Sequence, residues 1–445
     1  MSTGGHFLLT TETVKTYLTE GLRLFSPGEP LTAEEIGDGN INYVFRVRSV
    51  ASGRSLIVKQ ADTLLRSSGR PLDISRSKRE AEALQIYAAL TPQFIPQIYR
   101  YDAVMSTICM EDISYCRNLR KELMAGRIPA GLAEYAASFL AEAVFPTSGL
   151  ILSPEEKKER VKAFINPELC AITETLVFSE PYCNGKNRNR ITAGNEAFVQ
   201  KKLYDDEVLK TEIGALRETF MNKAEALIHG DLHTGSVFTG SQDASGTPIL
   251  KIIDPEFAFY GPIGYDLGNL IANLYFAWMH AVFTGSAASA DKGIVQDSIE
   301  NGAAAIQTGD DKTASFCTEI AAAIEHLPLL FKEKMLQKCR SSQLSDPVYN
   351  EGFLQRQAAD ILADGFGFAG TEMIRRTVGD TKTPEFDAMG TAPRRIAAER
   401  ALIKTARLLI KRRRTNGIGV IAAENFRQMI TKPVRTHSYR TDQPY

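Results

Sequence analysis

The sequence predicts an α+β fold of two lobes, in which a small antiparallel sheet with one helix precedes a large, mainly helical part that carries a β-hairpin. Short segments of alternating apolar and polar residues with Gly and Asn turns fill residues 31–60. Helical periodicity dominates later, and a brief β-rich stretch at 227–253 interrupts it. We expect an N-terminal lobe over 1–113 and a C-terminal lobe over 114–445.

In the N-terminal lobe, a helix over residues 75–90 presents a partly apolar face. The strands expected beside it cover residues 32–36, 43–47, 56–59, 97–101 and 107–110.

In the C-terminal lobe, the apolar stretch from Leu270 to Phe283 is short for a membrane span and typical of a buried helix. Residues 284–312, rich in Ala, Ser, Gly and Asp, predict a loop. The expected helices cover 119–124, 131–145, 154–164, 195–223 and much of 265–429, and the expected hairpin covers 227–238 and 249–253.

The composition gives no support to nucleic-acid binding, membrane-surface binding or a cysteine metal site. The 52 basic residues balance 53 acidic ones, so nothing favours a nucleic-acid or membrane-surface partner. The six cysteines form no CxxC pair and no Cys/His metal-ligand spacing, and the N-terminus shows no basic leader with a long apolar run. We therefore expect a cytoplasmic protein with reduced thiols.

The strongest local motif is His229-Gly230-Asp231-Leu232-His233-Thr234-Gly235-Ser236, directly after an apolar strand. An Asp in such a tight turn can accept the proton of a substrate hydroxyl and orient that hydroxyl toward a phosphoryl donor. An ordinary turn Asp with two structural histidines is the alternative. Asp231 is the candidate catalytic residue.

Two carboxylates, Asp254 and Glu256, follow the strand that ends near Ile253, with Pro255 between them. Mg²⁺ prefers oxygen ligands, and alternate residues of a strand point the same way. The pair therefore predicts a magnesium site if strand geometry persists; a solvated strand end is the alternative.

Lys59 closes an otherwise apolar strand, and the next helix offers Glu80 and Glu82 as ion-pair partners, which spacing does not rank. A lysine in this place contacts nucleotide phosphates in kinases. The turn at 37–42 contains Gly39 and Asn40 and can bring backbone N–H groups to phosphates, although a plain hairpin turn is the default. The chain has no GxxxxGK[ST] loop.

Three further features give weaker evidence of function than these motifs: residues 111–113, Asp266, and the pair Arg375 and Arg376. Glu111, Asp112 and Ile113 lie where strands give way to helices, so their backbone can bond an adenine edge or simply link the lobes. Asp266, at a helix start, is placed to support the catalytic turn by accepting backbone N–H bonds.

Arg375 and Arg376 lie in a helical segment, 365–379. Neighbours on a helix point about 100° apart, so only one is expected to face a given site. A surface helix is the alternative.

The order of these features resembles the protein-kinase-like fold, and HGDLH in place of HRD resembles its aminoglycoside phosphotransferase and choline kinase branch. The strings HGDLHTGS at 229–236 and DPEFAFYGP at 254–262 are similar to those of the 5-methylthioribose kinase family, as are residues 37–42 and 365–379. These segments span most of the chain.

The resemblance implies transfer of the ATP γ-phosphate to the anomeric hydroxyl of 5-methylthioribose, giving 5-methylthioribose 1-phosphate in methionine salvage. It implies Mg²⁺ on Asp254 and Glu256, Asp231 at the hydroxyl, an arginine from Arg375 and Arg376 at the sugar, and a homodimer. The ATP site it implies comprises Gly39, Asn40, Lys59, Glu111, Asp112, Ile113, Asp254, Pro255 and Glu256.

Ser236 departs from the kinase-like pattern, because most such enzymes carry a metal-binding Asn there. The alternatives are a phosphotransferase for choline, homoserine or an aminoglycoside, or a nucleotide-binding pseudokinase scaffold. The single tryptophan, Trp278, gives little support to an aromatic cage for a cation. The joint presence of Lys59, Asp231 and the two carboxylates at 254 and 256 speaks against a scaffold.

Overall fold

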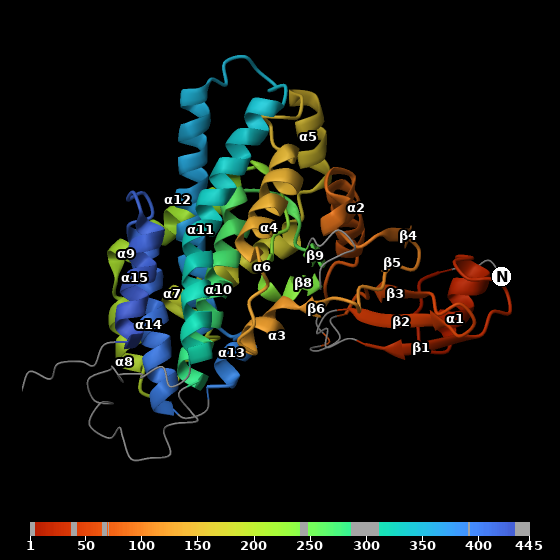
Figure 1. The fold of residues 1–445 in the computed structure, drawn as a ribbon, viewed down its shortest axis with the longest axis horizontal. Helices are drawn as coiled ribbons and strands as arrows, with labels where there is room; N and C mark the ends of the chain where they lie inside the picture. Colours follow the sequence, from red (N-terminus) through yellow and green to blue (C-terminus); the bar gives the residue numbers. More distant parts are fainter. Residues whose placement is uncertain are drawn as a thin grey trace, which may run out of the picture.

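The computed structural model describes residues 5–36, 42–64, 69, 71–240, 248–285, 311–389 and 392–431. Within them an antiparallel five-stranded sheet with one long helix precedes a larger helical part, which confirms the predicted fold class. In Figure 1 the sheet and the N-terminus lie at one side of the molecule, and the helices fill the other. The expected loop at 284–312 lies mostly outside the described residues.

The N-terminal sheet has the strand order β1-β2-β3-β5-β4. Its central strand β3 (Ser55–Gln60) buries Leu56 and Val58 in one core cluster. Because strand side chains alternate, Lys59 points to the opposite face, toward α2 (Arg76–Leu90). The other elements of this lobe are α1 (Thr13–Thr16), β1 (Leu31–Glu35), β2 (Tyr43–Ser49), β4 (Ile98–Asp102) and β5 (Thr107–Glu111).

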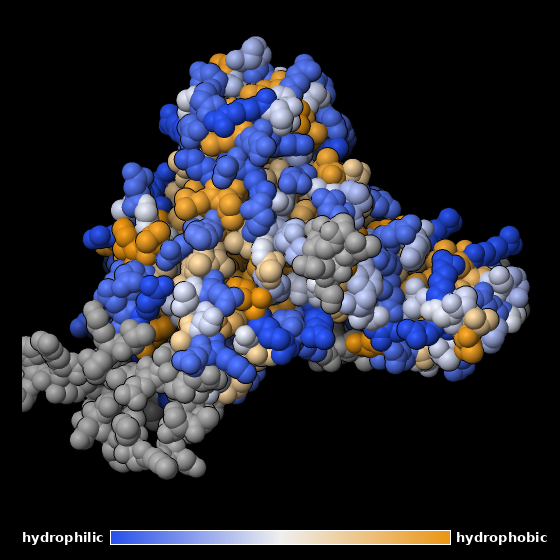
Figure 2. Space-filling view, viewed as in Figure 1, coloured by the Kyte–Doolittle hydropathy of each residue, from blue (hydrophilic) through white to orange (hydrophobic). Residues whose placement is uncertain are grey.

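Helix α2 connects the sheet to the helical lobe through buried contacts. Its Leu84 and Tyr87 belong to the large core cluster of that lobe, and the Tyr87 hydroxyl donates a hydrogen bond to the Leu227 carbonyl at 2.9 Å. On the face shown in Figure 2, the described surface is mostly hydrophilic, with small separate hydrophobic patches. Most of the large apolar side chains are instead buried in three core clusters.

The helical lobe is built around α10 (Ile263–Gly285), α11 (Asp311–Ser341) and α12 (Glu351–Val378) (Figure 1). The apolar stretch of α10 is buried, as predicted. By length and composition alone α11 is apolar enough to cross a membrane. It packs against α4, α10 and α12, however, and buries Phe316, Ile324 and Phe331, so we describe it as a core helix.

The remaining elements complete this lobe. The strands are β6 (Arg117–Asn118), β7 (Ala226–Ile228), β8 (Val237–Gly240), β9 (Ile249–Ile252) and β10 (Phe259–Gly261). The helices are α3 (Leu119–Met124), α4 (Leu132–Phe139), α5 (Pro154–Ala163), α6 (Pro167–Phe178), α7 (Glu180–Cys183), α8 (Glu196–Val199), α9 (Glu207–Asn222), α13 (Pro384–Asp387), α14 (Ala392–Lys411) and α15 (Ile418–Thr431).

The β-rich insertion is larger than the expected hairpin. Strands β8 and β9 form that hairpin, but β6 joins it, and β7 pairs instead with β10. The turn after β7, including the 3₁₀ turn Thr234–Ser236, separates β7 from β8, so each strand pairs with a different neighbour. Helices α6 and α7 were not predicted.

Helices α10 and α12 cross at backbone contact. A Cβ added to Gly268 would lie 2.6 Å from the backbone nitrogen of Ala369, and one added to Gly264 would lie 2.7 Å from that of Gly365. Glycine at these positions lets the two helices approach closely. The last turn of α12, which carries Arg375 and Arg376, therefore passes beside the catalytic turn that α10 supports.

Candidate active site

Asp231 lies in the turn that follows β7. The turn needs glycine at 230, because Gly230 has φ +81° and a Cβ there would lie 2.3 Å from the carbonyl oxygen of Phe257. Asp266, in the first turn of α10, accepts the N–H of His229 at 2.7 Å and of Gly230 at 3.0 Å. The contact expected of Asp266 is therefore present, and burial raises its pKa to about 6.

The turn is also joined to the segment before Asp254. The His229 Nε2 lies 2.9 Å from the carbonyl oxygen of Ile253, and the Ile253 N–H donates to the Ser236 carbonyl at 3.0 Å. These two hydrogen bonds hold the turn that carries Asp231 against the segment that carries Asp254.

Asp254 and Glu256 converge, but not through strand geometry as expected. Strand β9 ends at Ile252, and Asp254 has φ +73°, a left-handed conformation that non-glycine residues rarely adopt. Even so, carboxylate oxygens of Glu80, Asp254 and Glu256 all lie within 4.8 Å of one another. The backbone turn, not alternation along a strand, brings them together.

Lys59 connects the sheet to this cluster. Its Nζ lies 2.8 Å from Glu80 and also forms an ion pair with Asp254. Glu82, left as an alternative partner, lies 3.7 Å from Lys78 instead. Burial alone would lower the pKa of Lys59, but the carboxylates of Asp254, Glu80 and Glu256 outweigh it and raise the pKa, so the ammonium stays charged.

Two residues of the cluster were missed by sequence reasoning. Arg76 is only 1% exposed, its Nε lies 3.6 Å from Glu256, and it donates to the Asn42 side chain at 3.0 Å. Asn42 in turn donates to Glu256 at 3.1 Å. In the sequence, Arg76 looks like any charged residue on the surface of a helix, so no local pattern predicts that it belongs to the site.

The other half of the site brings two arginines to Asp231. Glu372 accepts a hydrogen bond from Nε of Arg376 at 2.9 Å and lies 2.6 Å from Nε of Arg375. Nη2 of Arg375 lies 3.7 Å from Oδ1 of Asp231, and Nη2 of Arg376 lies 4.0 Å from it. The expectation that only one faces the site was wrong, because both long side chains bend toward Glu372.

These neighbours set the charge of Asp231. Burial alone would raise the pKa of this carboxyl, but the His233 ring and the Arg375 and Arg376 guanidinium groups hold it at about 2. Asp231 is therefore ionised at neutral pH and able to accept a hydrogen bond from an alcohol.

The acidic side chains of the segment between the lobes make local contacts, and the adenine contact of its backbone stays a prediction. Asp112 accepts hydrogen bonds from Arg46 at 3.0 Å and Ser55 at 2.6 Å, and Glu111 accepts one from Tyr115 at 2.7 Å. These side chains therefore serve local structure. Ile113 is buried, and Gly39 and Asn40 lie outside the described residues.

The acid cluster fits a divalent cation. The carboxyl groups of Glu80, Asp254 and Glu256 converge beside two side-chain cations, Lys59 and Arg76. Burial raises the pKa of Glu80 to about 8, so Asp254 and Glu256 carry the negative charge of the cluster. Burial and the charge of Asp254 raise the pKa of Glu256 to about 6. Mg²⁺ prefers oxygen ligands, and this cluster gathers carboxylate oxygens at one place.

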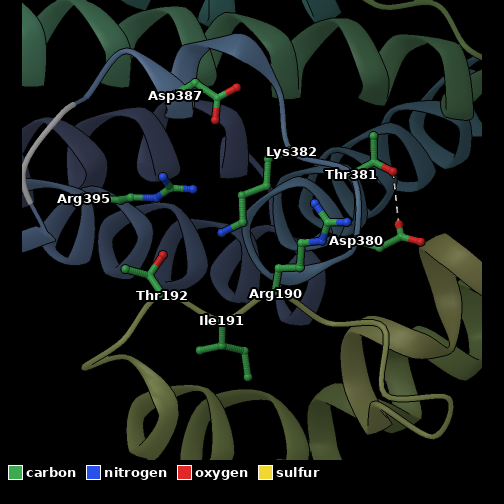
Figure 3. Close-up of a pocket in the computed structure, with 8 residues that line it drawn as sticks. All are labelled: Arg190, Ile191, Thr192, Asp380, Thr381, Lys382, Asp387 and Arg395. Atoms are coloured by element: carbon green, nitrogen blue, oxygen red, sulfur yellow. Dashed lines mark hydrogen bonds between the residues drawn. The ribbon is translucent and has the colours of Figure 1, made fainter. Parts of the chain in front are cut away.

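A separate cavity of about 520 Å³ lies beside the loop that follows α12 (Figure 3). Lys382 and Arg395 project into it while contacting the buried Glu399 at 3.1 and 3.2 Å. Among the described residues, none that the sequence predicts for the site lines this cavity. The lining comprises Arg190, Ile191, Thr192, Asp380, Thr381, Lys382, Asp387 and Arg395.

Comparison with known proteins shows the family to which the chain belongs. The model of the phosphotransferase enzyme family matches residues 32–291, more than half of the chain. Methylthioribose kinase of Geobacillus thermodenitrificans is 33% identical over 96% of this chain and 97% of its own length. That of Pectobacterium atrosepticum is 36% identical over 86% and 89%. A solved choline kinase from Cryptosporidium parvum aligns over 94% of each chain at 12% identity and a TM-score of 0.44.

The chain is thus a member of the phosphotransferase enzyme family, whose reactions transfer a phosphoryl group. Within it, the chain belongs to the methylthioribose kinase family, since its relatives of that name align along nearly their full length.

Proposed function

We propose that this protein transfers the γ-phosphoryl group of ATP to the 1-hydroxyl of 5-methylthioribose, forming 5-methylthioribose 1-phosphate in methionine salvage. The names of the relatives support the substrate. The observation that carries the mechanism is that Lys59 and Asp254, from different lobes, meet beside a turn whose Asp231 faces two arginines.

Each side chain has a distinct task in this mechanism. Asp231 accepts the hydrogen bond of the 1-hydroxyl, aligns its oxygen with the γ-phosphorus, and takes the proton as the new P–O bond forms. Lys59 binds the phosphates, and Glu80 holds its ammonium. Arg375 and Arg376 bind the sugar and offset the charge of the moving phosphoryl group.

Asp254 and Glu256 would hold Mg²⁺, which neutralises phosphate charge when bound. Gly39, Asn40, Pro255 and the backbone of 111–113 complete the proposed ATP site. We further infer a lobe boundary at 113–114, a cytoplasmic location and a homodimer, all consistent with the family.

The test is an assay of the full chain with ATP, Mg²⁺ and 5-methylthioribose, followed by ADP release and identification of the 1-phosphate. Asp231→Ala is expected to lower kcat at least about 10²-fold, as for loss of a general base, while ATP still binds. Asp205→Ala, which removes an exposed carboxylate outside the site, is the matched control. Turnover of choline, homoserine or an aminoglycoside in place of 5-methylthioribose would overturn the substrate, and an unchanged Asp231→Ala rate would overturn the mechanism.

A further inference from the structure

The ring of His233 is held in one tautomer by Ser236. The backbone N–H of Ser236 is shared between the His233 carbonyl oxygen at 2.9 Å and Nδ1 of His233 at 3.1 Å, and the Ser236 hydroxyl lies 3.2 Å from that nitrogen. Because a backbone N–H is always a donor, its contact with Nδ1 favours the tautomer in which Nδ1 is the unprotonated acceptor. Burial also lowers the pKa of His233 to about 4, which leaves a neutral ring at pH 7 with its hydrogen on Nε2.

That N–H faces the catalytic carboxylate. Nε2 of His233 lies 3.6 Å from Oδ2 of Asp231, while Oδ1 faces Arg375 and Arg376 at 3.7 and 4.0 Å. The two oxygens of Asp231 therefore have different neighbours, an imidazole N–H on one side and guanidinium groups on the other. Without the imidazole, the carboxylate is free to rotate until both oxygens face the arginines.

The same contacts account for the serine at 236. Its hydroxyl and its N–H both point at His233, and the side chain is 3% exposed. Resting on the proposed function, we propose that His233 is a positioning residue for Asp231, locked as the Nε2–H tautomer by Ser236, so that Ser236 serves the catalytic carboxylate and not a metal ion.

Two substitutions of His233 distinguish a role in positioning Asp231 from a role in the fold of the turn alone. His233→Asn keeps an acceptor for the Ser236 N–H but is too short to reach Asp231, whereas His233→Gln can extend an amide N–H toward it. We expect the Asn variant to lose about tenfold in kcat with the KM for ATP unchanged, as for a slightly misplaced reacting group. The Gln variant should recover at least about threefold of that loss. His326→Asn, an exposed histidine of α11, is the control.

Ser236→Ala tests the second half of the proposal. It should lower kcat slightly and leave the Mg²⁺ concentration for half-maximal activity unchanged. A rise of tenfold or more in that concentration would make Ser236 a metal ligand and overturn its proposed role. Equal kcat for the Asn and Gln variants, or wild-type kcat for the Asn variant, would overturn the role of His233.

Nitrogen-15 spectra of histidine-labelled wild-type protein test the tautomer directly, even if a variant fails to fold. An Nδ1–H signal for His233 would overturn the proposal, and an Nε2–H signal is expected. Because each kinetic result is a ratio to the wild-type rate, it can be measured with whichever alcohol the wild-type protein phosphorylates. A wrong substrate is therefore distinguishable from a wrong role for His233.

Discussion

Glu80 and Glu82 lie two residues apart on α2, yet the structure gives them opposite surroundings. The side chain of Glu80 is 2% exposed and contacts Lys59, whereas that of Glu82 is 38% exposed and pairs with Lys78 on its own helix. An exposed helical pair contributes a few tenths of a kcal/mol, while a buried carboxylate that holds a functional ammonium fixes its position. Only one of the two should therefore matter for activity.

We predict that Glu80→Gln raises the KM for ATP or lowers kcat by about tenfold or more, because the Lys59 ammonium loses the group that orients it. Glu82→Gln should behave as wild type. Steady-state kinetics of the two purified variants, with ATP varied, check this. Equal effects of the two substitutions would show that Lys59 is positioned by something other than Glu80.

At this scale the sequence predicts residues whose neighbours along the chain reveal them. Asp231 and Asp254 each follow an apolar strand in a distinctive turn, and Lys59 ends one. Arg76, Asn42 and the carboxylate of Glu372 were missed, because their partners are distant in sequence and only packing brings them together.

Among the elements, α9 and α14 are joined at Asp206. This residue caps α9 through the Leu209 N–H at 3.0 Å, binds Lys411 at 2.7 Å and forms an ion pair with Arg407. Burial alone would raise its pKa, but hydrogen bonds from Arg407 and Lys411 outweigh it and lower the pKa from 3.8 to about 2. The ionised carboxylate is therefore favoured in the folded protein.

We predict that Asp206→Asn, which keeps the cap but removes the charge, lowers the free energy of unfolding by about 2 kcal/mol at pH 7. Because the folded pKa lies below the unfolded one, this contribution is complete above about pH 5 and is lost as the pH falls toward 2. Urea unfolding of both proteins between pH 7 and 3.5 measures it, with Asp205→Asn as control. A difference that stays constant to pH 3.5 would contradict the assignment.

At the scale of elements, the sequence predicts the bounds of those helices and strands that have a clear apolar periodicity. The five N-terminal strands and α2 fall within a residue or two of expectation, whereas the helix expected over 195–223 breaks where Asp206 starts a new one. The pairing of β7 with β10 was not predictable, because strand partners depend on where a turn directs the chain. The close crossing of α10 and α12 rests on glycines that periodicity does not mark.

In the whole molecule, the two lobes meet at the acid cluster. Lys59 and Asn42 of the N-terminal lobe contact Asp254 and Glu256 of the C-terminal lobe. A nucleotide bound here touches both lobes, so it stabilises them jointly. If Lys59 turns to the phosphates, Asp254 loses its cation, and the carboxylates then face the anionic phosphates unless a metal ion lies between.

We therefore predict that ATP with Mg²⁺ raises the melting temperature much more than ATP with EDTA. A ligand at about 100 times its Kd stabilises the folded state by about 2.7 kcal/mol. Repulsion from Asp254 and Glu256 should remove most of this when the metal is absent. Asp254→Asn should lose the Mg²⁺-dependent part of the shift, whereas Asp205→Asn should keep it. Differential scanning fluorimetry measures the shift of all three proteins with Mg²⁺ and with EDTA. Equal shifts with Mg²⁺ and EDTA would mean that the acid cluster holds no metal at the nucleotide.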